Sequence, residues 1–391
     1  MVGSRQNSLT SVLRDAWVEI DLSAIEFNVE VIKAWLARNE EPAKLMAVVK
    51  SDAYGHGATQ ISEVLVNSGA SFLGVASLDE GKQIRMAGIK TPTLILSPSP
   101  IWALDSAIEN DLDLTISSVN QLKAIESAAK KCEKPASVHI KVDTGMHRLG
   151  MEILKFADVL DYVESAKSLR LKSVFSHLAL ASDKEAVDYQ FDKFKEVFSN
   201  FKNRKQVDFH LASSEAVESF EKTHLDMVRV GLYLYGLRPR VESGNLKPAM
   251  SVKARIINII NVPEGEKAGY NWTWTAKRPS RLASIPIGYA DGVARELSNN
   301  LNGFLMGKEI KQAGIISMDQ MLFDITDVPE AEEGDVVTLI GKDDKLKNRE
   351  LTIASWASKL DTITYELVCR LRARLPRIYT RVRRKFDTRN L

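Results

Sequence analysis

Five basic or imidazole side chains stand at the ends of short apolar segments: Lys50, Lys141, His177, His210 and Arg229. Chance placement would not put these groups at five such ends, so we interpret them as parts of one site. An amine in a desolvated pocket has a lowered pKa and can form a Schiff base with an aldehyde. Lys50 is the first candidate for this chemistry, because a buried apolar run precedes it. A surface lysine is the alternative for Lys50, and a hydrogen-bonded core position is the alternative for the two histidines.

The residues that follow these segments suggest which aldehyde is bound. Tyr54 and two glycines follow Lys50, and the glycines allow a ligand to approach the backbone closely. Ser214 and Gly231 follow the last two apolar segments, where barrel enzymes commonly bind phosphate. A Schiff-base lysine and a phosphate site together indicate pyridoxal phosphate (PLP).

Apolar runs alternate with amphipathic stretches up to about residue 240. The predicted strands are Leu45–Lys50, Phe72–Ala76, Thr93–Ser97, Leu112–Ile116, Ser137–Val142, Lys172–His177, Gln206–His210 and Asp226–Val230. The predicted helices are Ser23–Arg38, Ala58–Gly69, Val119–Lys130, Met151–Lys167 and Lys184–Phe201. Eight strands interleaved with helices over about 200 residues favour a closed (β/α)8 barrel of the TIM type, with chemistry where the strands end. An open, doubly wound sheet is the alternative.

The pattern becomes mainly β after residue 244, and no long helix is predicted before Leu351–Lys359. The β-rich runs are Val252–Val262, Arg281–Ile287, Ile310–Ile316, Met321–Ile325 and Val336–Ile340. We therefore predict an α/β chain with two domains. Residues 1–244 form a PLP-binding barrel, and residues 245–391 form a C-terminal, mainly β domain.

The overall composition excludes several classes of protein. The 391 residues hold 53 Lys and Arg against 51 Asp and Glu, a balance that argues against nucleic-acid binding. Two cysteines exclude a disulfide scaffold, and no metal site is predicted. No apolar run is long enough to span a membrane, and the first fifteen residues lack a signal-peptide core, so we expect a cytoplasmic protein. A solvated basic tail is predicted over residues 381–391.

Several motifs resemble those of alanine racemases, PLP enzymes built from a barrel and a β domain. The cofactor-lysine signature is similar to the segment from Ala47 to Gly57, AVVKSDAYGHG. Further similar segments follow in the family's order across nearly the whole chain: Lys141–Gly150, Met227–Gly231, Pro286–Gly292, Ser317–Gln320 and Thr364–Glu366.

The resemblance implies a role for each matching residue. Lys50 would hold PLP covalently and act as one of two bases, and Tyr270 would be the second base. The residues around the cofactor would be Tyr54, His177, Ser214, Arg229, Gly231 and Leu232. Arg229 would face the pyridine nitrogen, to which a guanidinium cannot give up a proton. The weaker electron sink that results suits return of the proton to the same carbon.

The resemblance also implies a head-to-tail homodimer that acts on a small amino acid. Each active site would receive Tyr270, Tyr289 and Met318 from the partner subunit, and Arg148 would bind the substrate carboxylate together with the Met318 amide. Lys141 matches a lysine that is carbamylated in some members and orients the arginine. The implied role is to supply D-alanine for peptidoglycan, without contact to nucleic acid or membrane.

Three positions depart from the family pattern. A family asparagine is Ser213 here, a glycine after the second base is Asn271, and a tyrosine near the C-terminus of some members is Ala373. These changes leave substrate breadth open. The alternatives are a broad-specificity racemase, for example for serine or lysine, a PLP decarboxylase of basic amino acids, and a non-catalytic PLP-binding barrel. Arg229 argues against the decarboxylase, and the second domain argues against the single barrel.

Overall fold

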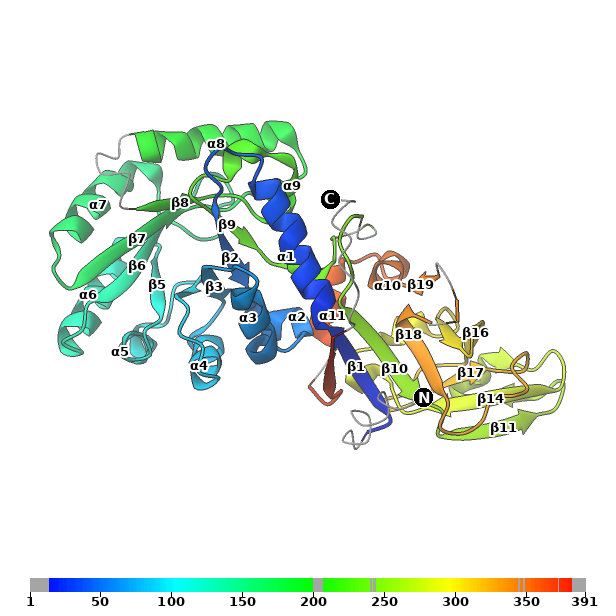
Figure 1. The fold of residues 1–391 in the computed structure, drawn as a ribbon. Coiled ribbons are helices and arrows are strands. Elements are labelled where there is room, and N and C mark those ends of the chain that lie inside the picture. The colour runs from blue at the N-terminus through cyan, green and yellow to red at the C-terminus, as the bar shows by residue number, and fades with distance from the viewer. Residues whose placement is uncertain are drawn as a thin grey trace. The chain divides into compact units, whose positions relative to one another are not determined.

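The computed structural model describes residues 14–199, 207–239, 241, 244–343, 345–346, 349–371 and 373–381. Within these ranges the chain forms two compact units (Figure 1). Residues 25–234 make the first unit, and residues 14–24 and 235–381 make the second. None of the described helices combines the length and the apolar character that a membrane crossing requires. The segment 1–13 and the predicted basic tail beyond residue 381 lie outside the described residues.

The first unit is built on eight parallel strands in the order β8-β7-β6-β5-β4-β3-β2-β9. The strands are β2 (Lys44–Val48), β3 (Phe72–Val75), β4 (Thr93–Ile95), β5 (Asp113–Ile116), β6 (Ala136–Lys141), β7 (Leu169–Phe175), β8 (Asp208–His210) and β9 (Met227–Val230). The two ends of this order meet, because the Asp226 amide donates to the Phe209 carbonyl at 3.0 Å and the Arg229 amide to the Ala212 carbonyl at 3.1 Å. The sheet therefore closes into a barrel, as predicted, and the open-sheet alternative is wrong.

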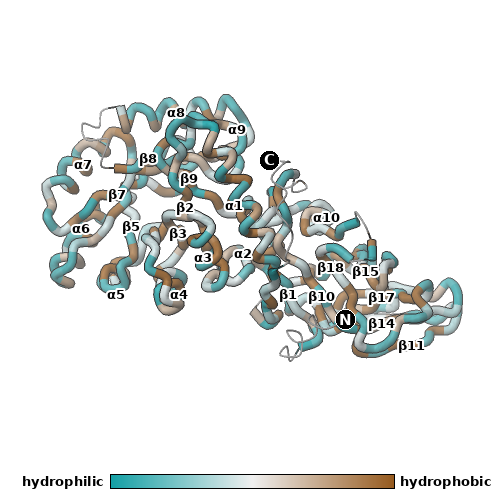
Figure 2. Tube along the Cα trace, in the orientation of Figure 1, coloured by the Kyte–Doolittle hydropathy of each residue, from teal (hydrophilic) through white to brown (hydrophobic). Residues whose placement is uncertain are grey.

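Amphipathic helices follow the strands. They are α1 (Leu22–Leu36), α2 (Lys50–Gly55), α3 (Ala58–Asn67), α4 (Leu78–Met86), α5 (Leu104–Glu109), α6 (Val119–Lys131), α7 (Phe156–Ser165), α8 (Lys184–Ser199) and α9 (Ser214–Ser219). Serine N-caps begin two of them, since the Ser77 side chain accepts from the Glu80 amide and the Ser118 side chain from the Gln121 amide. Hydrophilic and hydrophobic residues alternate along these helices in Figure 2. Four of the five predicted helices are α1, α3, α6 and α8, whereas Met151–Lys167 shortens to a single turn followed by α7.

The second unit is built around one large sheet in the order β11-β14-β17-β16-β15-β18-β10-β1-β20, with β19 paired to β18. Its strands are β1 (Ala16–Asp21), β10 (Met250–Arg255), β11 (Asn258–Val262), β14 (Ser280–Ile285), β15 (Asn302–Leu305), β16 (Lys308–Ala313), β17 (Met321–Asp324), β18 (Val336–Lys342), β19 (Glu350–Leu351) and β20 (Arg377–Thr380). Strand β1 runs antiparallel to β10 and parallel to β20. The first strand of the described residues therefore belongs to this sheet.

One predicted run of the second unit is divided in the structure. The β-rich run Val252–Val262 contains parts of two strands, β10 and β11, which lie at separate places in the sheet. The Ile256 amide still donates to Asp335, whereas the next amide, of Ile257, donates to Ser284. The chain thus changes its pairing partner between two consecutive residues, which alternation of side chains cannot reveal.

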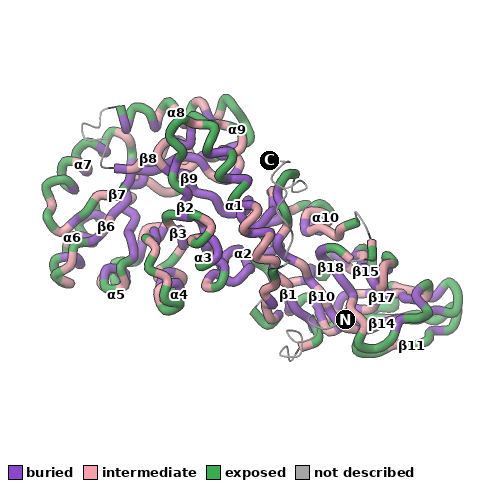
Figure 3. The backbone as a smooth tube through the Cα atoms, viewed as in Figure 1, coloured by how far each residue is buried: buried purple, intermediate pink, exposed green. Residues whose placement is uncertain are grey.

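Each unit has an apolar core of its own. Met46, Leu94, Met227 and Phe175 pack together inside the barrel from four different strands. In the second unit, two short helices, α10 (Ile353–Lys359) and α11 (Thr364–Arg370), accompany the sheet. Figure 3 shows the barrel strands as largely buried and the helices around them as a mixture of exposed and intermediate residues. The barrel therefore supplies a rigid support for the residues at its strand ends.

Candidate active site

Lys50 lies at the start of an unusual turn at the end of β2. Strand β2 ends at Val48, so Lys50 is the first residue of the short helix α2 and not the last residue of the strand. The four residues from Ser51 to Tyr54 have φ angles of 53° or 54°, a left-handed conformation that is costly for residues other than glycine. Strained backbone of this kind persists only where the surroundings enforce it, and it gathers at functional sites.

Glu80 of α4 enforces part of this turn. Its two carboxylate oxygens accept hydrogen bonds from the Ser51 amide at 2.8 Å and from the Ala76 amide at 2.7 Å. Nothing in the sequence marks Glu80 as part of the site. The Ser77-x-x-Glu80 spacing is the signature of a helix N-terminus, but it gives no sign that the carboxylate reaches the turn after Lys50.

Three residues predicted to contact a phosphate lie together at the barrel mouth. The Gly231 amide donates to the Ser214 hydroxyl at 3.1 Å. A β-carbon on Gly231 would lie 2.4 Å from the hydroxyl oxygen of Tyr54. Leu232, the next residue, is buried and begins the 3₁₀ helix η6 (Leu232–Tyr235). Only glycine therefore fits at this position, and the hydroxyl groups of Tyr54 and Ser214 flank its backbone.

Arg229 is held by a set of neutral acceptors. One terminal nitrogen, Nη1, donates to the carbonyl of His210 at 3.0 Å and faces the Nδ1 atom of His210 at 2.9 Å. The other, Nη2, donates to the carbonyls of Ser176 and Leu211 and faces His177 Nδ1 at 3.2 Å. Because a guanidinium only donates, both imidazoles must present an unprotonated Nδ1 to it.

Burial tunes the charges of these groups. It lowers the pKa of Arg229 to about 9, which still leaves the guanidinium charged at neutral pH. Loss of water and then the charge of Arg229 lower the pKa of His177 to about 3, so this ring is neutral. Within the described ranges, Arg229 forms no ion pair with a carboxylate. A cation is thus fixed by neutral groups.

Lys141, at the end of β6, adds to an excess of positive charge. Its ammonium group lies 5.2 Å from the ring centroid of Phe175. Burial, followed by the charges of Arg229, Arg148 and Lys50, lowers the pKa of Lys141 to about 8. Four predicted site residues of the barrel therefore lie close enough to repel one another, which suits a ligand with several negative charges.

The nearest acid at the barrel mouth does not balance this charge fully. Asp143 accepts hydrogen bonds from the amides of Gly145, Met146 and His147, at 2.9 to 3.1 Å, and so orders the loop that carries Arg148. The chemistry of the cluster, an amine, three further cations and a glycine-lined cradle, fits an anionic aldehyde such as PLP. No group of three or more His, Cys, Asp or Glu suited to a metal ion occurs among the described residues.

The remaining predicted residues belong to the second unit and are exposed. Tyr270 begins the 3₁₀ helix η7 (Tyr270–Trp272) and is 67% exposed, and Met318 is 54% exposed. The Tyr289 amide donates to the Ser317 carbonyl at 3.1 Å, which brings Tyr289 and Met318 together. A β-carbon on Gly288 would lie 2.3 Å from that carbonyl, so this contact requires glycine. No hydrogen bond in the described part of the chain joins Tyr270 to this pair.

A fully buried carboxylate, Asp291, fixes the segment that carries Tyr289. It accepts a hydrogen bond from the Gly288 amide at 3.0 Å and forms ion pairs with Arg14 at 2.7 Å and Arg374 at 3.0 Å. The motif around Tyr289 is visible in the sequence, whereas the two arginine partners of Asp291 lie far from it in the chain. The sequence alone therefore does not indicate that these arginines pair with Asp291.

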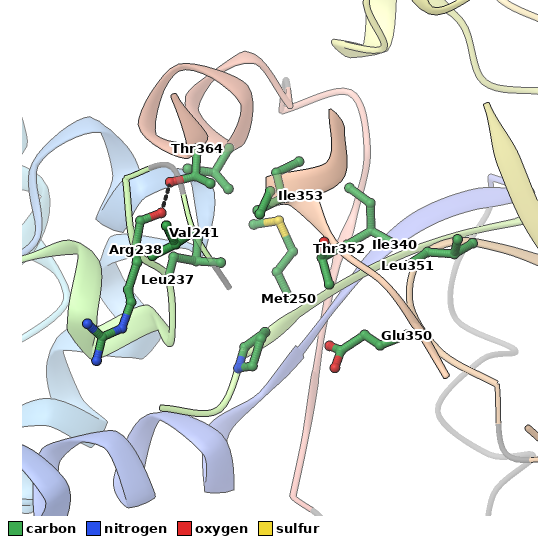
Figure 4. Close-up of a pocket in the computed structure, with 13 residues that line it drawn as sticks. Leu237, Arg238, Val241, Met250, Ile340, Glu350, Leu351, Thr352, Ile353 and Thr364 are labelled. Carbon is green, nitrogen blue, oxygen red and sulfur yellow. Dashed lines mark hydrogen bonds between the residues drawn. The ribbon is translucent and has the colours of Figure 1, made fainter. Parts of the chain in front are cut away.

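A pocket in the second unit contains none of the predicted site residues (Figure 4). Apolar side chains such as Met250, Ile340 and Ile353 line it, and the Thr364 hydroxyl donates to the Arg238 carbonyl at 2.7 Å beside it. The two charged residues of this pocket, Arg238 and Glu350, have opposite signs, so it lacks the excess of positive charge found at the barrel mouth. We therefore place the candidate site at the barrel mouth.

Family models and curated relatives agree on what this chain is similar to. The model "Alanine racemase, N-terminal domain" matches residues 20–239, and "Alanine racemase, C-terminal domain" matches residues 249–379. The alanine racemase of Nostoc sp. is 40% identical over 379 residues, which cover 93% of this chain and 95% of that protein. The chain belongs to the alanine racemase family.

Solved structures of this family share the fold. The alanine racemase of Clostridium difficile 630 superposes with a TM-score of 0.88 at 31% identity, and covers 95% of this chain and 97% of its own. The alanine racemase of E. faecalis gives a TM-score of 0.87 at 32% identity, with 95% and 99% covered. As a member of the alanine racemase family, the protein is an isomerase with a TIM-type barrel and a mainly β second part.

Proposed function

We propose that the protein interconverts L-alanine and D-alanine with PLP as cofactor and two opposed bases. The observation that carries this proposal is the cluster at the barrel mouth, where an amine, a glycine-lined cradle and a buried guanidinium lie together. Relatives named alanine racemase match along nearly the whole chain, which supports the same substrate.

The residues that would hold PLP follow from this cluster. Lys50 would bind it covalently, and Tyr54, Ser214 and the amides of Gly231 and Leu232 would bind its phosphate. When bound, PLP supplies an electron-withdrawing ring that makes the α-hydrogen of an attached amino acid acidic. The Gly231 cradle, which admits no β-carbon, lets the phosphate approach the backbone.

Arg229 would set the strength of this electron withdrawal. A guanidinium whose pKa stays near 9 keeps its proton at neutral pH, so Arg229 would donate a hydrogen bond to the ring nitrogen without protonating it. His177 and His210 keep the guanidinium in place. A neutral ring nitrogen withdraws electron density less strongly than a protonated one. The weaker withdrawal favours return of the proton to the same carbon over side reactions.

Racemisation requires a base on each face of the α-carbon, and we assign these to Lys50 and Tyr270. The two residues belong to different units of the chain. We propose a homodimer in which residues 245–391 of one subunit complete the site of the other, so that the partner subunit's Tyr270 faces Lys50. The exposure of Tyr270, Tyr289 and Met318 supports this arrangement, because large side chains that a single subunit leaves exposed suit an interface.

The substrate carboxylate would bind Arg148 and the Met318 amide, with Tyr289 beside them. Lys141 would orient Arg148 after carbamylation. Its lowered pKa supports this role, because only an uncharged amine attacks carbon dioxide. We further propose that the enzyme is cytoplasmic and supplies D-alanine for peptidoglycan. A racemase of broader specificity, acting also on serine or lysine, is the second candidate, since Ser213, Asn271 and Ala373 leave pocket size open.

Assays of the purified protein with each enantiomer test this function. We expect one PLP per chain and formation of D-alanine from L-alanine, and the reverse, at comparable maximal rates. Parallel assays with serine and lysine distinguish the second candidate. A PLP-loaded protein that leaves both alanine enantiomers unchanged contradicts the proposal.

A further inference from the structure

Polar side chains replace the usual apolar filling along one side of the barrel interior. Asp113, His139, Ser173, His210 and Arg229 come from five consecutive strands, β5 to β9, and none is more than 6% exposed. Barrels of this type are normally filled by Val, Ile and Leu. Five adjacent buried polar groups therefore require an explanation in terms of hydrogen bonding.

These five side chains form one continuous chain of hydrogen bonds. Asp113 Oδ2 lies 3.0 Å from His139 Nε2, and His139 Nδ1 lies 2.5 Å from the hydroxyl oxygen of Ser173. The same hydroxyl lies 2.6 Å from His210 Nε2, and His210 Nδ1 lies 2.9 Å from Arg229 Nη1. Every step between Asp113 and Arg229 is a hydrogen bond, so the chain has no gap. At its positive end Arg229 also donates to the carbonyls of Ser176, His210 and Leu211.

The two ends fix the direction of every hydrogen bond. Arg229 can only donate, so His210 accepts at Nδ1 and carries its hydrogen on Nε2. His210 then donates to Ser173, and the Ser173 hydroxyl is left to donate to His139 Nδ1. His139 therefore carries its hydrogen on Nε2 and donates it to Asp113, which as a carboxylate only accepts. The reverse direction would set an N–H of His210 against an N–H of Arg229.

The chain runs through the barrel from one end to the other. Asp113 is the first residue of β5, whereas Arg229 stands near the end of β9, and parallel strands begin at one face and end at the opposite face. Asp113 lines an open cavity at the far face together with the basic residues Arg85, Lys134 and Lys172. The negative end of the chain thus lies outside the reaction site, and the positive end lies within it.

We propose that Asp113, His139 and Ser173 are positioning residues that hold His210 as an acceptor for Arg229 and thereby fix the guanidinium at the barrel mouth. Hydrogen bonds that point in one direction polarise and strengthen one another. The loss of the Ser173 hydroxyl therefore weakens the hydrogen bond between Arg229 and His210. The effect on catalysis rests on the proposed role of Arg229. The positions of the hydrogens along these hydrogen bonds do not depend on that role.

Ser173→Ala interrupts the chain at its centre with the smallest change in volume. The variant removes the acceptor of His210 Nε2 and the donor to His139 Nδ1 at once. Thr115→Val is the matched control, because Thr115 is also a buried hydroxyl on a barrel strand but donates only to the Ile95 carbonyl, at 2.7 Å. Asp113→Asn, which preserves size and removes the charge, serves as a second variant if Ser173→Ala does not fold.

Nitrogen-15 NMR of histidine-labelled holoenzyme reads the hydrogen positions directly, since the chain has six histidines. We expect His139 and His210 to be neutral with the hydrogen on Nε2 in the wild type and in Thr115→Val. In Ser173→Ala the signals of both rings should shift, and in Asp113→Asn the His139 signals should shift. A hydrogen on His210 Nδ1, or a charged ring, in the wild type would overturn the proposal.

Kinetics of the same proteins test the effect on Arg229. Ser173→Ala should lower kcat for alanine about tenfold, the loss expected for one buried hydrogen bond, with KM changed by less than about twofold. Thr115→Val should retain the wild-type kcat. An unchanged kcat in Ser173→Ala, with His210 displaced, would refute the positioning role. If the wild type itself fails to racemise alanine while its NMR signals are as expected, the proposed function fails and the chain of hydrogen bonds stands.

Discussion

The Tyr54 hydroxyl occupies the space in which a side chain at Gly231 would begin. An added β-carbon would lie 2.4 Å from the hydroxyl oxygen and 3.0 Å from the ring carbon that bears it. A rigid aromatic ring cannot give way as a flexible chain can, and Tyr54 itself is held in a left-handed conformation. The cradle therefore depends on the absence of a β-carbon.

Gly231→Ala should weaken PLP binding by at least about tenfold, because the tyrosine hydroxyl must move out of the cradle. Bound PLP per chain, measured by absorbance during titration of the stripped protein, checks this. Gly81→Ala is the control, since a β-carbon on this residue of α4 meets only the flexible side-chain end of Leu112, at 2.6 Å, outside the cradle. Equal PLP binding by the two variants would count against the cradle.

Lys50→Ala should abolish racemisation in both directions, with a loss of at least about a thousandfold, because the covalent anchor and one base disappear together. The assay follows both enantiomers by chiral chromatography. Lys44→Ala, which removes a lysine that pairs with Asp208 at the other end of β2, should keep wild-type rates. Near-normal activity of Lys50→Ala would exclude the assigned role.

Mixed dimers test the shared site. Lys50→Ala and Tyr270→Phe chains should each be inactive as homodimers. After unfolding and refolding together, about a quarter of all sites should hold both bases, since half of the dimers are mixed and each has one complete site. Activity should recover to that fraction. The absence of recovery in mixed dimers isolated by two affinity tags would contradict a site built from two subunits.

Replacement of Lys141 should change the free energy of unfolding in a direction that depends on whether Lys141 is a free amine or is carbamylated. A pKa near 8 in the folded protein, against 10.5 in the unfolded chain, means that folding penalises the charged amine. The penalty is fully present below pH 8, and the free energy of unfolding should rise as the pH increases from 8 to 10.5. Lys141→Met should therefore stabilise the protein by roughly 3 kcal/mol at pH 7 in buffer free of carbon dioxide.

Carbamylation would reverse this sign, because an anion among Arg148 and Arg229 stabilises the fold. With bicarbonate present, Lys141→Met should then be less stable than the wild type. Urea unfolding in both buffers provides the measurement, with the exposed Lys44→Met as control. Destabilisation by Lys141→Met in buffer free of carbon dioxide would show that the amine is not penalised as we infer.

Strand ends were predictable from the sequence, and contacts across the fold were not. The runs before Lys50, Lys141 and Arg229 have the length and composition of buried strands, so the barrel and the ends of its strands could be predicted. Glu80 could not be assigned to the turn after Lys50, because helix periodicity does not specify which loop a carboxylate reaches. Ser173 could not be recognised either, since a small hydroxyl within an apolar run carries no signal until its neighbours are known.

The pairing of β1 has a consequence for the order in which the chain is made. Val18 in β1 donates a backbone hydrogen bond to Pro376, so β1 can pair with β20 only after the barrel and the other strands of the second unit have been made. Pairing across such a long loop is slow, and an unpaired strand is prone to associate with other chains. Before residues 377–380 are made, one edge of β1 pairs with β10 and the other edge is open, so we expect nascent chains that end before residue 377 to associate with one another more readily than chains that include β20.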